Sequence, residues 1–170
     1  MFMRIVTETS HLIIRTWQES DFPNYATLIG DNPNDLNGFS DNGPNCRAET
    51  ELWGYQLEQD RFGWSRWAII YKKTNELIGY CGFAPYHDDV EINWRFLQKW
   101  RSSSLAIDAI KAVAQVGFEV LNFNKIISFT RADNSFSIEI LEKVGMTLEC
   151  MEGWSTCTVA RYSLSCKQDR

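Results

Sequence analysis

The chain has 170 residues, 44% of them hydrophobic and 23% charged, with a formal net charge of -5. These values are typical of one globular domain over residues 1–170, and an acidic chain without a basic tract argues against nucleic acid as a partner. No apolar run is long enough to cross a membrane and no signal-peptide pattern is seen, so we expect a cytoplasmic protein without a membrane partner. Five cysteines without a C-x-x-C pair favour reduced thiols.

The first regular segment is predicted at residues 11–17, which read as a strand. Ser20 or Asp21 can cap a helix that runs to about Leu28.

Residues 30–46 are dense in Asn, Asp, Gly and Pro, which favours turns. A calcium loop is excluded, because Gly38 as its sixth position places Pro33 first and Pro44 twelfth, and neither supplies a side-chain ligand. Two interpretations stay open for this segment, a binding lid and a plain surface connection. We expect no metal site.

In the rest of the chain, segments with the 3.6-residue apolar period of helices alternate with segments that resemble strands. Helices are predicted at residues 47–62, 105–120 and 134–144. Strands are predicted at residues 64–71, 76–83, 89–96, 125–130, 146–151 and 158–164. The turn at 72–75 suits a hairpin, and Gly145 suits the end of a helix. This order predicts an α/β fold with antiparallel and crossover connections.

The junction between the strand ending near Phe96 and the helix starting near Leu105 holds three serines, residues 102–104. A small-residue turn from strand to helix directs unpaired backbone N–H groups outward, and the helix dipole adds to their attraction for phosphate. Serine can also simply cap the helix start, so phosphate binding and a ligand-free cap both stay open.

Three stretches carry a family resemblance. Residues 10–21 (SHLIIRTWQESD) resemble the start T-E-R-L-x-L-R-x-W-x-x-x-D, and residues 91–109 align without a gap to E-I-G-Y-W-L-x-P-x-x-W-G-K-G-Y-A-T-E-A. Residues 129–146 match F-T-x-x-x-N-x-x-S-x-x-V-L-E-K-L-G-F more closely. Over nearly its whole length the chain resembles the GNAT acyltransferases, in particular the group that includes ribosomal-protein N-terminal acetyltransferases.

This resemblance implies the GNAT fold, a mixed central sheet flanked by helices. It also implies an N-acetyltransferase that moves an acetyl group from acetyl-CoA to a primary amine by direct attack in a ternary complex. The acceptor is expected to be a protein N-terminal α-amine or a small amine, and the protein a monomer or homodimer. The alternative is a GNAT-fold binding or interaction protein with weakened catalysis.

The acyl-CoA signature of the family, Gln/Arg-x-x-Gly-x-Gly/Ala, corresponds to residues 101–106, where Ser104 replaces a glycine. Glycine permits close approach of the backbone to phosphate, whereas serine adds a side chain that can obstruct or donate. The resemblance assigns cofactor contacts to Arg101, Ser102, Ser103, Ser104, Leu105, Ala106, Asn134 and the backbone of Phe96, Leu97 and Gln98.

Acetyl transfer needs a base for the ammonium and an acid for the departing thiolate. The resemblance places Glu91 at the base position, acting directly or through water, although a strand carboxylate paired with a cation is equally compatible with the sequence. Leu141 stands where many relatives carry a tyrosine acid. Ser137 is a candidate proton donor, while Asn134 and Ser137 also suit a helix N-terminus.

The acceptor side is the least defined. Trp94, on the strand of Glu91, is the candidate pocket residue, although most buried aromatics belong to the core. Asp88 and Asp89 are backup candidates for the base and could instead attract a cationic acceptor. His87 is a weaker candidate for a titratable group near the acceptor.

Overall fold

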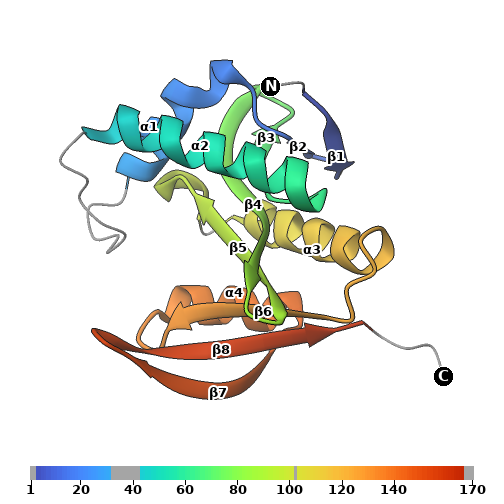
Figure 1. Cartoon of the computed structure of the whole chain (residues 1–170), viewed down its shortest axis with the longest axis vertical. Helices are drawn as coiled ribbons and strands as arrows, with labels where there is room; N and C mark the ends of the chain where they lie inside the picture. The colour runs from blue at the N-terminus through green and yellow to red at the C-terminus, as the bar shows by residue number, and fades with distance from the viewer. Residues whose placement is uncertain (1–2, 32–42, 102, 167–170) are drawn as a thin grey trace.

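The computed structural model describes residues 3–31, 43–101 and 103–166, with the side chains of residues 43–45 left out. Four α-helices and two short 3-10 turns flank one eight-stranded sheet in this part of the chain (Figure 1). The strands are β1 (Ile5–Glu8), β2 (Leu12–Arg15), β3 (Arg66–Tyr71), β4 (Glu76–Tyr86), β5 (Asp89–Phe96), β6 (Lys125–Arg131), β7 (Thr147–Trp154) and β8 (Cys157–Ser165). The helical segments are η1 (Glu19–Asp21), α1 (Phe22–Gly30), α2 (Gly43–Phe62), η2 (Gln98–Trp100), α3 (Ser104–Glu119) and α4 (Ser135–Val144).

The sheet has the order β1-β2-β3-β4-β5-β6-β8-β7. Every neighbouring pair is antiparallel except β5 and β6, which are parallel and share a single registered pair, Glu91 with Ile127. By contrast, β4 and β5 stay paired over the whole of β5. The second half of β5 therefore has an edge that β6 does not cover, and Figure 1 shows the two strands diverging there.

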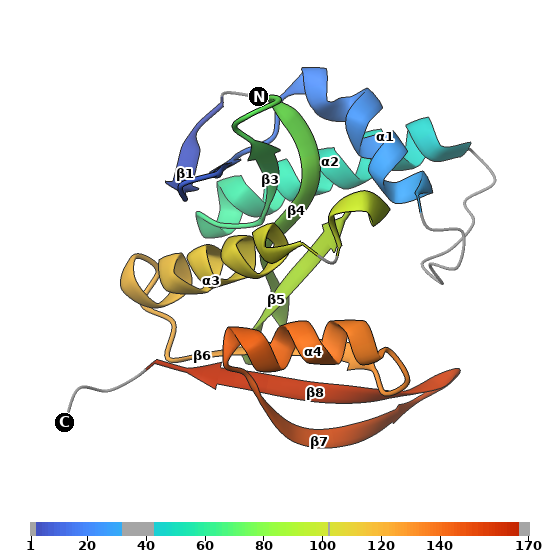
Figure 2. The same ribbon diagram turned by 180° about the vertical axis from the view of Figure 1, so that it is seen from behind.

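Each face of the sheet has its own apolar core. On one face, α1 and α2 pack through residues such as Tyr25, Leu52 and Ala68. On the other face, α3 and α4 pack through residues such as Ile110 and Leu141 (Figure 2). We call these the α2 face and the α3 face. Strand residues alternate between them, so a residue's parity along β5 decides which face receives its side chain.

Most of the predicted elements lie close to their expected positions, and the predicted mixed α/β architecture is confirmed. The prediction at the N-terminus was incomplete, because a short edge strand, β1, precedes β2 and was not predicted. The prediction of a turn-rich segment at 30–46 was wrong at its C-terminal end, since α2 already begins at Gly43. Its central part, residues 32–42, lies outside the described residues.

Candidate functional site at the open edge of strand β5

Glu91 lies in the middle of β5, at the one point where β5 and β6 are in register. Its registered neighbours Ala84 and Ile127 are buried, and it shares the α2 face with them. Burial raises the pKa of the Glu91 carboxyl above its usual value, because a low-dielectric surrounding disfavours the charged form. The amide of Asn93, which donates to Oε1 at 3.5 Å, and the positive charge of Arg66 oppose this shift only in part.

The described residues include no ion pair to Glu91, so the alternative of a structural salt bridge has no support there. A half-buried carboxyl with a raised pKa, close to an open strand edge, has the properties of a general base.

The open edge of β5 offers backbone groups of alternate residues. The N–H of Leu97 donates to Ile78 O at 2.9 Å, toward β4, whereas the carbonyl of Ile92 accepts from Ser128 Oγ at 3.1 Å, toward β6. Because these directions alternate along a strand, the backbone groups of Trp94 and Phe96 point to the uncovered side. This edge can bind an extended chain that carries amide groups, as the pantetheine arm of a coenzyme A thioester does.

The predicted backbone cradle comprises Phe96, Leu97 and Gln98, and the N–H groups of the last two already have partners within the protein. Leu97 uses its N–H inside the sheet, and the N–H of Gln98 donates to the carboxylate of Asp31 at the end of α1. The backbone of Trp94 is a further candidate that the sequence pattern did not single out, because the side of a strand on which N–H groups lie depends on its pairing.

The start of α3 leaves its first-turn N–H groups available. Ser103 is the N-cap residue, but its hydroxyl donates to Trp100 O at 2.7 Å and makes no capping bond. Ser104 is exposed at the first helical position, and the amides of Ser104 and Leu105 have no acceptor within the helix. Ala106 donates to Ser103 O at 3.2 Å. The prediction for Ser102 lies outside the described residues.

A pocket of about 130 Å³ adjoins this helix start. Its lining comes from α3, α4 and the preceding turn: Arg101, Ser103, Ile107, Phe136, Glu139, Ile140 and Lys143. Arg101 extends along the end of β5, with its Nε 3.5 Å from Phe96 O. Free helix N–H groups, an unpaired strand edge and a nearby guanidinium form a donor set that fits a diphosphate with an attached amide chain.

The candidates at the start of α4 have a clear structural role. Asn134 is the N-cap residue, and its Oδ1 accepts from the backbone N–H of Ser137 at 3.1 Å. The hydroxyl of Ser137 takes no part in this contact and stays available for a ligand. Capping therefore accounts for Asn134, whereas the proton-donor role of Ser137 remains a prediction.

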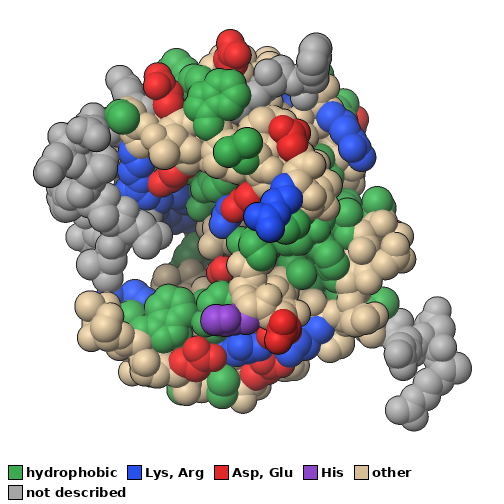
Figure 3. Space-filling model, in the orientation of Figure 1, with side chains coloured by type: hydrophobic (Ala, Val, Ile, Leu, Met, Phe, Trp, Pro, Cys, Tyr) green, Lys and Arg blue, Asp and Glu red, His purple; other side chains and the backbone are tan. Residues whose placement is uncertain are grey.

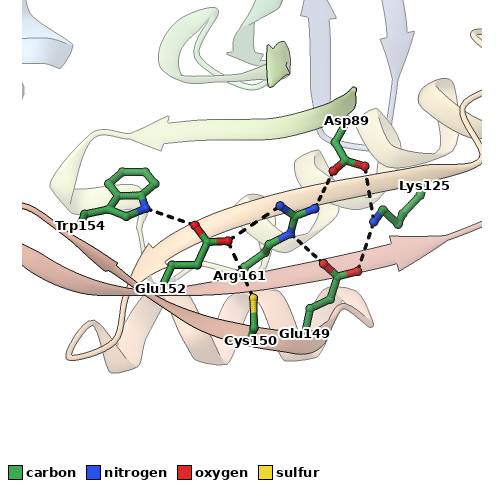
Figure 4. A network of polar contacts seen from close by, with 7 residues as sticks. All are labelled: Asp89, Lys125, Glu149, Cys150, Glu152, Trp154 and Arg161. Carbon is green, nitrogen blue, oxygen red and sulfur yellow. Dashed lines mark hydrogen bonds and ion pairs between the residues drawn. The ribbon is translucent and has the colours of Figure 1, made fainter. Parts of the chain in front are cut away.

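Asp89 is held in an ion-pair network on the α2 face (Figure 4). Its carboxylate lies 2.6 Å from Arg161 and 3.4 Å from Lys125, and Arg161 also contacts Glu149 at 2.8 Å. Burial alone raises the pKa of Asp89, but the contacts with Arg161 and Lys125 outweigh it and lower the pKa. The predicted attraction of Asp89 for a cationic acceptor loses support, since its charge is already compensated.

Trp94 lies on the face opposite Glu91, because three positions separate the two residues along β5. Its ring packs against the core on the α3 face. The structure therefore does not bring Trp94 and Glu91 together as an acceptor pocket. The odd spacing between Glu91 and Trp94 in the sequence already indicated that their side chains lie on opposite faces of a strand.

Three aromatic residues missed by the sequence interpretation share the α2 face with Glu91 instead: Tyr86, Phe129 and Trp154. The α2 face is also hollowed, between the part built by α1 and α2 and the part built by β7 and β8 (Figure 3).

Neither a metal-binding cluster nor a membrane-spanning helix is present among the described residues. No group of three or more His, Cys, Asp or Glu side chains is placed to hold a metal ion. None of the described helices is both long and apolar enough to span a bilayer.

Comparison with known proteins places this geometry in a family. The family model described as "Acetyltransferase (GNAT) domain" matches residues 11–147. The uncharacterised protein YkkB of Bacillus subtilis is 26% identical over 144 residues, which cover 81% of this chain and 83% of YkkB. The uncharacterised N-acetyltransferase YoaA of the same organism is 32% identical over 96 residues, which cover 55% of this chain and 54% of YoaA.

Among solved structures, the ribosomal α-N-protein acetyltransferase RimL in complex with coenzyme A is similar in fold. It has a TM-score of 0.80 and 18% identity, and the match covers 95% of this chain and 98% of RimL. The family match spans well over half of the chain and agrees with the fold, the open β5 edge and the free start of α3. The chain belongs to the GNAT family of acetyltransferases.

Proposed function

We propose that the chain transfers an acetyl group from acetyl-CoA to a primary amine by direct attack, with Glu91 as the base. The observation that carries this proposal is Glu91 itself, half-buried with a raised pKa where β5 and β6 diverge. Membership of an acetyltransferase family supports the reaction class, and the name of RimL supports an amine acceptor of the same kind.

The residues divide the task by position. First-turn amides of α3 and Arg101 hold the diphosphate, while the outer edge of Trp94 and Phe96 aligns the chain that carries the thioester. Glu91 takes a proton from the acceptor ammonium, directly or through water, so that the amine lone pair is free. The new C–N bond forms as the C–S bond of the acetyl donor breaks. Ser137 is the proposed source of the proton for the thiolate, and its hydroxyl is restored by the proton that the newly acylated nitrogen loses.

A second candidate is the weakened binding protein, and one contact favours it. The carboxylate of Asp31 accepts from the N–H of Gln98, one of the backbone groups expected to hold the cofactor. This donor is therefore already occupied, which would weaken cofactor binding.

The test is a turnover assay with Glu91→Gln and the unmodified chain. Purified protein, acetyl-CoA and a library of primary amines are mixed, and released CoA thiol is measured. Loss of a general base lowers turnover by about a hundredfold or more. We expect this loss with unchanged affinity for acetyl-CoA in calorimetry.

Unchanged turnover in Glu91→Gln removes Glu91 from the base role. Acetyl-CoA binding without thiol release, for every amine in the library, supports the second candidate instead.

A further inference from the structure

Three aromatic side chains in contact with one another share a face of the sheet with Glu91 and are here called the aromatic wall: Tyr86, Phe129 and Trp154. Tyr86 lies two residues from Ala84, toward the start of β5, and Phe129 lies two residues from Ile127, toward the end of β5. Since Ala84 and Ile127 are the cross-strand partners of Glu91, both rings lie on its face of the sheet. Trp154 stands at the end of β7, beside the turn into β8.

The contacts make the wall one unit. The centroids of Tyr86 and Phe129 are 4.7 Å apart, and those of Phe129 and Trp154 are 5.4 Å apart. Tyr86 belongs to β4 and Phe129 to β6, which flank β5, so their rings meet across β5 on the side of Glu91. The wall therefore runs from the neighbourhood of the proposed base to the β7–β8 turn.

Other groups already cover parts of the wall. His87 packs edge-on against Tyr86 at 4.8 Å, and the guanidinium of Arg161 lies 5.7 Å from the centre of Phe129. Trp154 is still 46% exposed, and its Nε1 donates to Glu152 at 3.4 Å. An indole anchored at its polar edge presents a fixed apolar surface that another ring can cover.

The charged residues near the aromatic wall contribute little to the choice of acceptor. Asp89, Glu149 and Glu152 surround two cations, Lys125 and Arg161 (Figure 4), which leaves one uncompensated negative charge. This balance disfavours an acidic acceptor and offers no cluster of carboxylates for a polyamine. The aromatic wall therefore favours an acceptor through its ring surfaces and not through charge.

We propose that the acceptor is an arylalkylamine, a primary amine separated from an aromatic ring by one or two carbons. This inference rests on the proposed function. The ring stacks on Phe129 and Trp154, while the ammonium lies near Tyr86 and Glu91, where aromatic faces and the carboxylate both favour a cation. Phe129 and Trp154 thus determine specificity, and Glu91 performs the proton transfer.

The experiment compares 2-phenylethylamine, 2-cyclohexylethylamine and ethylamine as acceptors at saturating acetyl-CoA. Trp154→Ala is assayed with Met151→Ala as the matched control. Met151 is an equally exposed apolar residue of β7 at 54%, on the opposite face by strand alternation. Trp154→Phe retains a ring and tests rescue.

We expect the highest kcat/KM for 2-phenylethylamine. Trp154→Ala should lower that value about five- to tenfold, mainly through KM, from the lost ring stacking and apolar contact. Ethylamine should be almost unaffected, Met151→Ala should resemble the unmodified chain, and Trp154→Phe should recover most of the loss.

Equal losses for ethylamine and 2-phenylethylamine in Trp154→Ala, or no loss for either, overturn the inference. Turnover of other amines with none of 2-phenylethylamine also overturns it, yet leaves the proposed function intact. Failure of the proposed function has a different signature, since no amine then releases CoA thiol.

Discussion

At the scale of single residues, Glu91 combines two properties that oppose each other. Its burial is unfavourable for the ionised carboxylate, but the same burial makes it a stronger base near neutral pH. Asn93 and Arg66 reduce the unfavourable effect without forming an ion pair that would cancel it. Glu91 is therefore expected to lower stability in exchange for reactivity.

Glu91→Gln should increase the free energy of unfolding at neutral pH. The raised pKa means that the folded chain binds a proton more tightly than the unfolded chain, so stability declines as pH rises from the usual glutamic acid range through the pKa of folded Glu91. The variant lacks this decline. Urea unfolding at a series of pH values should show its advantage at pH 7 and none well below the usual range.

Glu49→Gln, at an exposed glutamate of α2, is measured alongside as the matched surface control. A stability difference for Glu91→Gln that is the same at every pH would contradict the assignment.

At the scale of elements, the N-termini of the two helices near the proposed cofactor site, α3 and α4, differ in how their first turns are capped. At α4, Asn134 caps the helix with its side chain, whereas at α3 the hydroxyl of Ser103 turns back to Trp100. The α4 start is closed by its own cap, and the α3 start keeps amides for a ligand. The side-chain cap at α4 contributes to stability, and the uncapped start of α3 is the proposed phosphate site.

Asn134→Ala should lower the free energy of unfolding by about 1 kcal/mol, because an N-cap side-chain bond is lost. Ser137→Ala should leave stability unchanged, since Ser137 contributes only its backbone N–H to that bond. If its hydroxyl protonates the thiolate, Ser137→Ala lowers kcat. Denaturant unfolding and the thiol-release assay measure the two effects separately.

Equal destabilisation by both variants would contradict the capping geometry. An unchanged kcat in Ser137→Ala would remove the hydroxyl from the proton-donor role.

The same elements show what the sequence alone could predict. Apolar periodicity located α3 and α4, and the strand with Glu91, because each buries one side over several turns or residues. It missed β1, a four-residue edge strand with little burial, and the start of α2 at Gly43, where glycine and proline are typical of turns. Trp94 was proposed as a pocket residue because it shares a strand with Glu91, but alternation along β5 places the two side chains on opposite faces. Phe129 and Trp154 could not be connected, since their contact depends on the register of β6, β8 and β7.

At the scale of the whole molecule, the sheet consists of two parts joined through one registered pair between β5 and β6. The larger part carries α1, α2 and most of the core. The smaller part, β6 to β8, carries most of the ion-pair network and two residues of the aromatic wall, whose third residue, Tyr86, belongs to β4. In the proposed reaction, the acetyl donor and the acceptor amine meet at the opening between the two parts. The account as a whole therefore depends on a ligand bound along the uncovered edge of β5.

Amide hydrogen exchange with and without acetyl-CoA tests this dependence most directly. At a saturating concentration, exchange should slow at Trp94 and Phe96, whose N–H groups face the opening, and at Ser104 and Leu105 in the first turn of α3. Leu97, already bonded to Ile78, serves as the internal control and should change little. Unchanged exchange at Trp94 and Phe96 under saturating acetyl-CoA would contradict the account.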